Sequence, residues 1–206
     1  MKRYPFLVTL LLLCGIVSAQ SNLRGLFVNL NGQATNFRYE DDDWSGGSMG
    51  YGGDVKLGIG TGGATFFIGT GLTRVTGDGA TRFAEDYSLR ATELGLRLQF
   101  GDRTVVPYVE LAGRYVTSEP YEGMRTRAAG GALAPGLLVF LSEHVALDAR
   151  ARLGATYVYA VEFPGAAVAG SGDGYPYASA GLHLGLTFYP SVRRARYRFE
   201  RGGGHL

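Results

Sequence analysis

Apolar residues recur at every second position in segment after segment of this sequence. In the last such segment the apolar positions are Ala178, Ala180, Leu182, Leu184, Leu186 and Phe188. The positions between them are small or polar, namely Ser179, Gly181, His183, Gly185 and Thr187. Successive side chains of a strand point to opposite faces, so this alternation predicts strands with one apolar and one polar face. Beyond residue 19 no stretch has the 18 or more apolar residues of a membrane-spanning helix.

The same alternation predicts eight strands. We place them at residues 26–35, 51–59, 64–75, 93–100, 108–115, 132–141, 145–157 and 177–188. The segment 132–141 is almost wholly apolar, and its register stays open. Short connections at 61–63, 101–103 and 142–144 alternate with long ones at 38–49, 76–87, 118–131 and 161–175. Such asymmetry is typical of transmembrane barrels with tight periplasmic turns and long outer loops. We therefore predict an all-β, eight-stranded antiparallel up-and-down transmembrane β-barrel with both termini on the periplasmic side.

A period of two leaves open which face points inward, because a soluble barrel of the lipocalin kind would have its apolar face inside. The polar face combines small residues with charges of both signs, which indicates a crowded lumen. The opposite face has almost no charge at membrane depth, as lipid requires. We expect Leu184→Arg on that apolar face to impair assembly far more than Gly185→Ser on the polar face.

An eight-stranded barrel is only wide enough for its interior side chains to fill it, so charges in the lumen must pair. We predict a structural charge network there, made of Asp54, Lys56, Glu93, Arg97, Glu110, Arg114, Asp148, Arg150, Arg152 and His183. Glu93, Arg97, Glu110 and Arg114 fall on neighbouring predicted strands, which favours cross-strand pairing among them. The lumen is thus expected to be a plug.

The two ends of the sequence predict export and a basic extension. Met1-Lys2-Arg3, the apolar stretch 6–17 and the small residue Ala19 have the three-part pattern of a signal peptide, so we expect cleavage after residue 19. We assign 1–19 to the signal peptide, 20–189 to an outer-membrane β-barrel and 190–206 to a basic periplasmic tail. Cys14, the single cysteine, lies in the signal. The mature barrel therefore depends on no disulfide.

Aromatic residues gather toward both ends of the predicted strands, which suggests two belts at the membrane interfaces. Those toward the long connections are Tyr39, Tyr51, Tyr87, Tyr115, Tyr157, Tyr159 and Tyr175; those toward the short turns are Phe66, Phe100, Phe140, Phe188 and Tyr189.

Over residues 23–189 the chain resembles the small outer-membrane barrels of the OmpA transmembrane-domain and OmpX type. The last strand carries His183, Gly185 and Phe188, similar to the signal that those proteins present to the barrel assembly machinery. The resemblance implies Gly185 and Phe188 as the assembly signal. It also implies a location in the cell outer membrane, among its lipid and lipopolysaccharide.

The sequence offers no convincing catalytic, cofactor or metal site. Ser142 and His144 lie in a predicted periplasmic turn, and Ser179 is four residues from His183, too far along a strand for a direct hydrogen bond. The acidic run 40–43 could bind a divalent cation, but charge runs in loops are usually only solvated. The Gly-rich stretch 170–174 lacks the helix and basic residue of a phosphate loop, and we interpret it as a hairpin tip.

These observations predict an integral outer-membrane protein with a structural or surface-interaction role and no enzymatic activity. It displays four outer loops, is monomeric and has no cofactor. Removal of Lys2 and Arg3 leaves 18 basic and 18 acidic residues, so charge does not point to a nucleic-acid partner. A narrow porin-like channel for ions or small solutes is the alternative, and a lipid A-modifying enzyme comes third.

Overall fold

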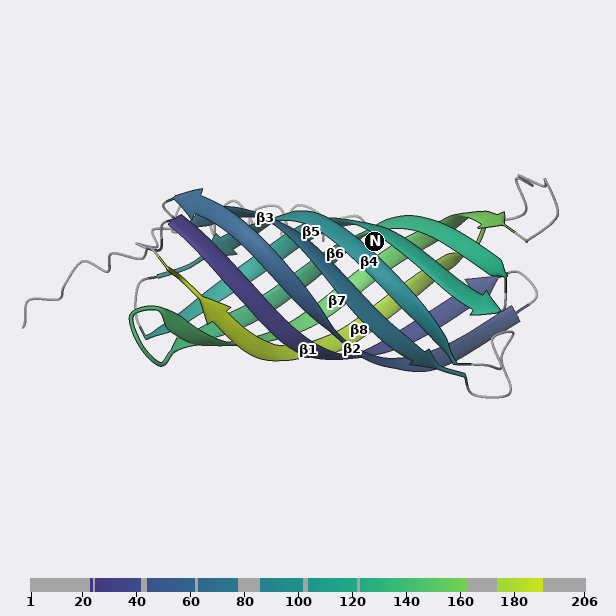
Figure 1. Cartoon of the computed structure of the whole chain (residues 1–206), viewed down its shortest axis with the longest axis horizontal. Coiled ribbons are helices and arrows are strands. Elements are labelled where there is room, and N and C mark those ends of the chain that lie inside the picture. Colours follow the sequence, from purple (N-terminus) through teal and green to yellow (C-terminus); the bar gives the residue numbers. More distant parts are fainter. Residues whose placement is uncertain are drawn as a thin grey trace, which may run out of the picture.

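The eight strands of the computed structural model form one closed antiparallel barrel in the order β1-β2-β3-β4-β5-β6-β7-β8 (Figure 1). The structure describes residues 23, 25–41, 44–61, 63–77, 86–101, 104–121, 123–162 and 174–190. The strands are β1 Gly25–Asp41, β2 Trp44–Thr61, β3 Ala64–Thr76, β4 Tyr87–Gln99, β5 Val105–Tyr121, β6 Met124–Phe140, β7 Val145–Glu162 and β8 Pro176–Phe188. The predicted fold class, an eight-stranded up-and-down barrel, is confirmed.

The barrel closes because its first and last strands pair. β1 and β8 run antiparallel from Val28 opposite Phe188 to Tyr39 opposite Tyr177. Closure leaves no sheet edge along this seam, which is the condition for a sheet to exist in lipid. No helix in the described residues is long and apolar enough to cross a membrane.

Two of the four predicted outer loops are wrong. β1 continues to Asp41 and β2 begins at Trp44, so most of 38–49 is a two-stranded ribbon in which Arg38 pairs with Gly47. β5 and β6 likewise continue to Tyr121 and Met124, where 118–131 was expected to be a loop. The other two connections, 77–86 and 163–175, do separate strands. Alternation is hard to recognise in the ribbons because few of their residues are apolar, although Tyr39 and Ala128 point inward and the backbones still pair.

The apolar side chains form the outer wall of the barrel and the polar side chains line its interior. Leu94, Leu182 and Leu184 are each more than 60% exposed, whereas Arg97 and Lys56 are at most 1% exposed. On β6, whose register the sequence left open, Leu133 and Leu137 point outward and Leu138 inward. This arrangement is the reverse of a lipocalin and is suited to a lipid surrounding.

The apolar wall has the height of a membrane. On β5 the outward positions from Val105 to Tyr115 are apolar or glycine, and Thr117 and Glu119 follow them. Ten residues at about 3.3 Å each, tilted by about 40°, rise about 25 Å, the usual height of the apolar band of a transmembrane barrel.

The predicted aromatic belts are correct only in part. Tyr51, Phe66, Tyr115, Tyr157, Tyr159 and Phe188 are on the outside, but Tyr39, Tyr87, Phe140 and Tyr189 are buried in the lumen. The prediction considered how far along a strand each ring lies and ignored whether its position was odd or even. The inward rings pack instead in the apolar clusters at the two ends of the lumen.

Candidate functional site

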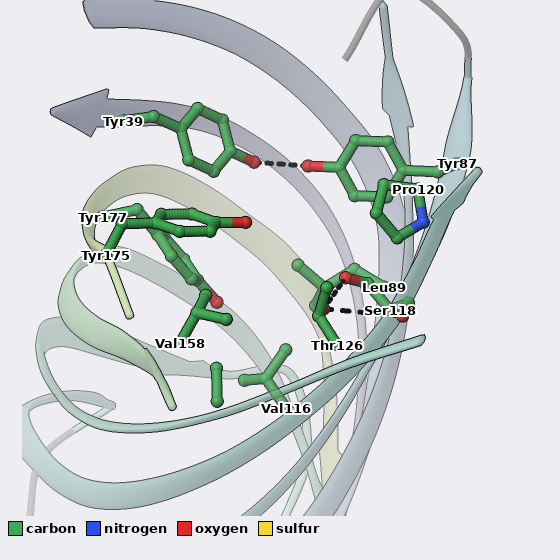
Figure 2. Close-up of a pocket in the computed structure, with 11 residues that line it drawn as sticks. Tyr39, Tyr87, Leu89, Val116, Ser118, Pro120, Thr126, Val158, Tyr175 and Tyr177 are labelled. Carbon is green, nitrogen blue, oxygen red and sulfur yellow. Dashed lines mark hydrogen bonds between the residues drawn. The ribbon is translucent and has the colours of Figure 1, made fainter. Parts of the chain in front are cut away.

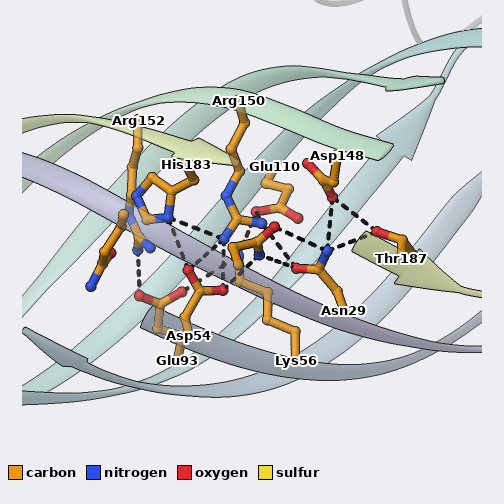
Figure 3. Close-up of polar contacts among 12 residues, drawn as sticks. Asn29, Asp54, Lys56, Glu93, Glu110, Asp148, Arg150, Arg152, His183 and Thr187 are labelled. Atoms are coloured by element: carbon orange, nitrogen blue, oxygen red, sulfur yellow. Dashed lines mark hydrogen bonds and ion pairs between the residues drawn. The ribbon is translucent and has the colours of Figure 1, made fainter. Parts of the chain in front are cut away.

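The interior holds a layer of ionisable side chains, which are the ten residues singled out in the sequence. They come from β2, β4, β5, β7 and β8, where alternate positions point inward. Nine are less than 9% exposed, and the side chain of the tenth, Arg114 on β5, is 8% exposed. Figure 3 labels eight of the ten, all but Arg97 and Arg114, and shows their side chains pointing into the space between the strands.

Glu93 on β4 holds together the outer part of the layer. Its carboxylate lies 3.2 Å from Nε of Arg114, 2.5 Å from Nη2 of Arg152 and 3.7 Å from Nζ of Lys56. Arg114 stands directly opposite Glu93 in the β4–β5 register, so this is one of the cross-strand pairs that the sequence favoured. One carboxylate therefore neutralises cations from three strands.

Glu110 on β5 has the same role deeper in the barrel. Lys56 Nζ donates to Oε2 at 2.6 Å, and Arg97 Nε donates to Oε1 at 2.8 Å. Arg150 approaches Oε2 at 3.5 Å. Arg97 is opposite Glu110 in the β4–β5 register, the second expected cross-strand pair, whereas Lys56 and Arg150 reach it across the lumen.

Asp54 on β2 accepts from the far wall. Arg150 Nη2 on β7 donates to both of its oxygens, at 2.7 and 2.8 Å, and His183 Nδ1 on β8 lies 2.9 Å from Oδ2. Asn31 on β1 completes the set by donating to Oδ1 at 3.1 Å. Arg150 and His183 belong to strands that are not neighbours of β2, so their contacts with Asp54 tie non-adjacent strands of the barrel together.

Asp148 on β7 is the fourth carboxylate, and its partners are mostly neutral. Thr187 and Asn29 each donate to Oδ2 at 3.0 Å, the Tyr108 hydroxyl donates to Oδ1, and Arg97 lies 3.3 Å away. The sequence prediction missed Asn29, Tyr108 and Thr187 as members of the network. Their position on the inward face was the signal that could have found them, since every buried polar group needs a partner.

The layer contains more formal positive than negative charge. Its four carboxylates face five cations, with His183 in addition. Aromatic faces take up part of the excess: Arg97 lies 4.6 Å from the ring centroid of Phe27 and 4.4 Å from that of Tyr108, and Lys56 lies 4.5 Å from that of Phe67. Attraction between a cation and the negative face of a ring stabilises such contacts.

Apolar clusters cap the charge layer at both ends. The outer cap comprises Phe37, Tyr39, Val75, Tyr87, Leu89, Ala91, Val116, Ala128, Val158 and Tyr177. The inner cap comprises Leu23, Phe27, Phe67, Val106, Tyr108, Leu138, Phe140, Ala146 and Tyr189. In the outer cap the hydroxyls of Tyr39 and Tyr87 bond to each other across the mouth (Figure 2). The space left there is about 10 Å³, room for about one water.

Neither His144 nor His183, the histidines in the described residues, stands next to a serine hydroxyl in the geometry of a nucleophile and its base. His144 Nδ1 contacts the backbone oxygen of Tyr189 at 3.0 Å, and the Ser142 hydroxyl accepts the backbone N–H groups of His144 and Val145. His183 points at Asp54 instead of Ser179. Within the described ranges, no group of three or more His, Cys, Asp or Glu side chains has the arrangement of a metal site.

Gly185 on β8 has a steric reason for being glycine. A Cβ there would overlap the Leu30 carbonyl oxygen and lie 2.6 Å from Asn31 Cα on β1. Gly185→Ser would therefore also cost stability, because any side chain would push apart the strands that close the barrel, and its comparison with Leu184→Arg stays a prediction. Phe188, the other residue of the expected assembly signal, is on the lipid face, 46% exposed.

Several sequence predictions lie outside the described residues: the signal peptide 1–19, the tail beyond Pro190, the glycines 170–173, and the acidic side chains 40–43.

The fold is that of the small eight-stranded outer-membrane β-barrels. Neisserial surface protein A is similar, with a TM-score of 0.57 and 14% identity over 80% of this chain and 99% of that one. OprG from Pseudomonas aeruginosa gives 0.49 and 14% over 82% and 97%, and Ail of Yersinia pestis gives 0.46 and 12% over 81% and 99%. No protein-family model and no curated protein sequence matches. At such identity the likeness to the Neisserial protein establishes the fold alone.

Proposed function

We propose that the chain is an integral protein of the outer membrane whose barrel is a closed, non-conducting support for the surface that it displays. The observation that carries this proposal is the layered interior, in which paired charges lie between two apolar caps. A water-filled pore needs a continuous polar path, and the outer cap leaves room for about one water. The displayed surface consists of the β1–β2 and β5–β6 ribbons and the connections 77–86 and 163–175.

The apolar wall supports the location, because a belt of this height would be unstable in water and matches the hydrocarbon thickness of a bilayer. We infer that the protein reaches this membrane by a cleaved signal peptide and is a monomer surrounded by lipid and lipopolysaccharide. The assembly machinery would recognise the end of β8, with Gly185 and Phe188 as its signal.

Planar-bilayer recording tests the closed lumen. We expect no steady conductance from the unmodified protein, nor from Tyr39→Ala, because the charge layer would still block the path below the outer cap. Steady conductance from the unmodified protein would favour the alternative, a narrow channel for ions or small solutes. Incubation with purified lipopolysaccharide tests the third possibility, and we expect no change in its acyl chains.

A further inference from the structure

A hollow on the outside of the barrel, at the end away from the termini, carries arginines. Its volume is about 810 Å³, and it extends over β3, β4, β5 and β6. Arg74, Arg90, Arg125 and Arg127 line it, together with Tyr115 and Thr117. The neighbouring carboxylates of Asp86 and Glu119 leave the lining residues with two more positive than negative charges. A cluster of cations is unexpected on a wall that is otherwise apolar.

Two of these arginines are placed to share one anion. The register sets Arg90 opposite Thr117 and Thr117 opposite Arg127, so the two arginines flank a hydroxyl on the strand between them. Their Cα atoms are two strand spacings apart, about 10 Å, a gap that two long side chains can close around a phosphate. Arg90 forms no ion pair among the described residues, and the ion pair of Arg127 with Glu162 is more than 40% exposed. An anion that binds to these two arginines therefore has no buried ion pair to break.

Below the arginines, the same wall has two adjacent outward positions without a side chain, which we call the trough. Gly113 on β5 is opposite Gly131 on β6, and both face outward. A Cβ on Gly113 would meet no atom closer than 3.9 Å, and one on Gly131 none closer than 3.6 Å, so nothing in the protein fills this space. Leu94 stands on one side, in register with Gly113, and Tyr115 lies between the trough and the arginines.

The two features meet at the edge of the apolar wall. Tyr115 is the last apolar outward residue of β5, and Thr117, in the row of Arg90 and Arg127, follows it. Because the apolar band is about 25 Å high, the arginines are at the level of the headgroups and the glycines are at the level of the acyl chains. This combination fits an amphipathic ligand with a phosphate at its polar end.

We propose that the hollow is a binding site for a phosphorylated glycolipid of the outer leaflet. Arg90, Arg127 and the Thr117 hydroxyl hold a phosphate, and an acyl chain lies over Gly113 and Gly131. The proposal rests on the outer-membrane location given above and adds to it a defined lipid position on one wall of the barrel.

Native mass spectrometry of the folded mature protein in detergent, titrated with bisphosphorylated lipid A, tests the site. We expect the double variant Arg90→Ala/Arg127→Ala to weaken binding about 30-fold, because each arginine near an anionic headgroup contributes about 1 kcal/mol. Removal of both phosphates from the lipid should weaken binding to the unmodified protein similarly. Arg38→Ala is the matched control, since Arg38 is also exposed and outward but lies on β1. Equal binding by the double variant and the control would overturn the proposal.

Two further measurements separate the parts of the site. Gly131→Leu should fill the trough and weaken lipid A binding severalfold, whereas Ala149→Leu, outward on β7, should not. Equal binding by these two variants would overturn the acyl-chain trough.

Millimolar inorganic phosphate should not displace the lipid, and displacement would show a site for the free anion instead. Conductance measurements on the same variants distinguish failure of the lipid site from failure of the closed lumen. A protein that neither conducts nor binds lipid A contradicts only the lipid site. A protein that conducts contradicts only the closed lumen.

Discussion

Glu93 shows how single residues stabilise this interior. Arg114 and Arg152 each form an ion pair with it, and in the described part of the chain neither has another. Lys56, by contrast, also pairs with Glu110. Charges buried this deeply are tolerated only with partners, so the carboxylate that serves several cations matters more than any one of them.

We therefore expect Glu93→Gln to lower the free energy of unfolding by about 3 to 5 kcal/mol, since it leaves two buried arginines without a carboxylate. Arg114→Ala should cost less, about 1 kcal/mol, because Glu93 keeps Arg152 and Lys56. Urea unfolding in lipid vesicles measures both. A larger loss for Arg114→Ala would contradict the sharing of Glu93.

Gly185 and Gly113 provide a second comparison between residues of one type. Gly185→Ala should destabilise the barrel by about 1 to 3 kcal/mol, because its Cβ would overlap the β1 backbone. Gly113→Ala adds the same methyl group to open space and should change stability by less than about 0.5 kcal/mol. Unfolding midpoints of the two variants decide the matter, and equal midpoints would refute the steric argument.

The sequence predicts which residues are in the lumen better than it predicts their contacts. The period of two is enough to place Asp54 and Arg150 inside. The neighbouring strands are enough to suggest pairing among Glu93, Arg97, Glu110 and Arg114, without saying which pairs with which. It gives no basis for joining Asp54 to Arg150, because β2 and β7 are not neighbours and their relative height depends on how the closed sheet is staggered. The apolar caps are not predicted for a simpler reason. Rings such as Tyr39 and Tyr189 are assigned to the membrane interfaces by their distance along the strand, and the face on which they lie is ignored.

Among the elements, β8 shows most clearly how a strand is adapted to two surroundings. Leu184 is 67% exposed near the middle of its apolar face, and His183 beside it is buried in the lumen. On the outer wall the cost of a charge depends on depth, since an interface can hydrate an arginine and the bilayer centre cannot.

Leu184→Arg is expected to destabilise the barrel by about 2 to 4 kcal/mol, and Ser88→Arg, outward at the headgroup end of β4, by about 1 kcal/mol or less. Unfolding in vesicles compares the two. Similar losses would mean that the wall at Leu184 is in water.

In the two ribbons, the sequence does not predict how far the strands extend. In β5 and β6 the alternation predicts the membrane-spanning part, but residues 118–131 contain polar residues and glycines that are equally typical of a loop. What continues the strands there is the pairing of backbones, such as Thr117 with Arg127 and Ser118 with Thr126, and backbone pairing leaves little trace in composition.

For the whole molecule, orientation follows from topology. Both ends of the chain's described part, Leu23 and Pro190, are at the end of the barrel that carries the β2–β3, β4–β5 and β6–β7 connections. Gly77 lies at the opposite end, after β3, and Glu143 lies at the same end as the termini, between β6 and β7.

A cysteine introduced by Gly77→Cys should react with a membrane-impermeant maleimide on intact cells, and one introduced by Glu143→Cys should react only after the outer membrane is permeabilised. The unmodified protein gives the background, because Cys14 lies in the predicted signal peptide. Reaction of Glu143→Cys alone on intact cells would mean that the barrel is inverted.

The seam between β1 and β8 also governs the order in which this protein can be made. Asn29 and Thr187, which bond across it, are 158 positions apart, and Asp54 and Arg150 are 96 apart. Until the last strand has been synthesised, the strands can form only an open sheet, in which Asn29 lacks Thr187 and Asp54 lacks His183. Such a sheet could not enter lipid strand by strand, because Asp54 and Arg150 would arrive unneutralised. Insertion must therefore wait for the C-terminal strand. A ribosome that stalls before β8 yields a chain that needs a chaperone to stay unaggregated in the aqueous phase.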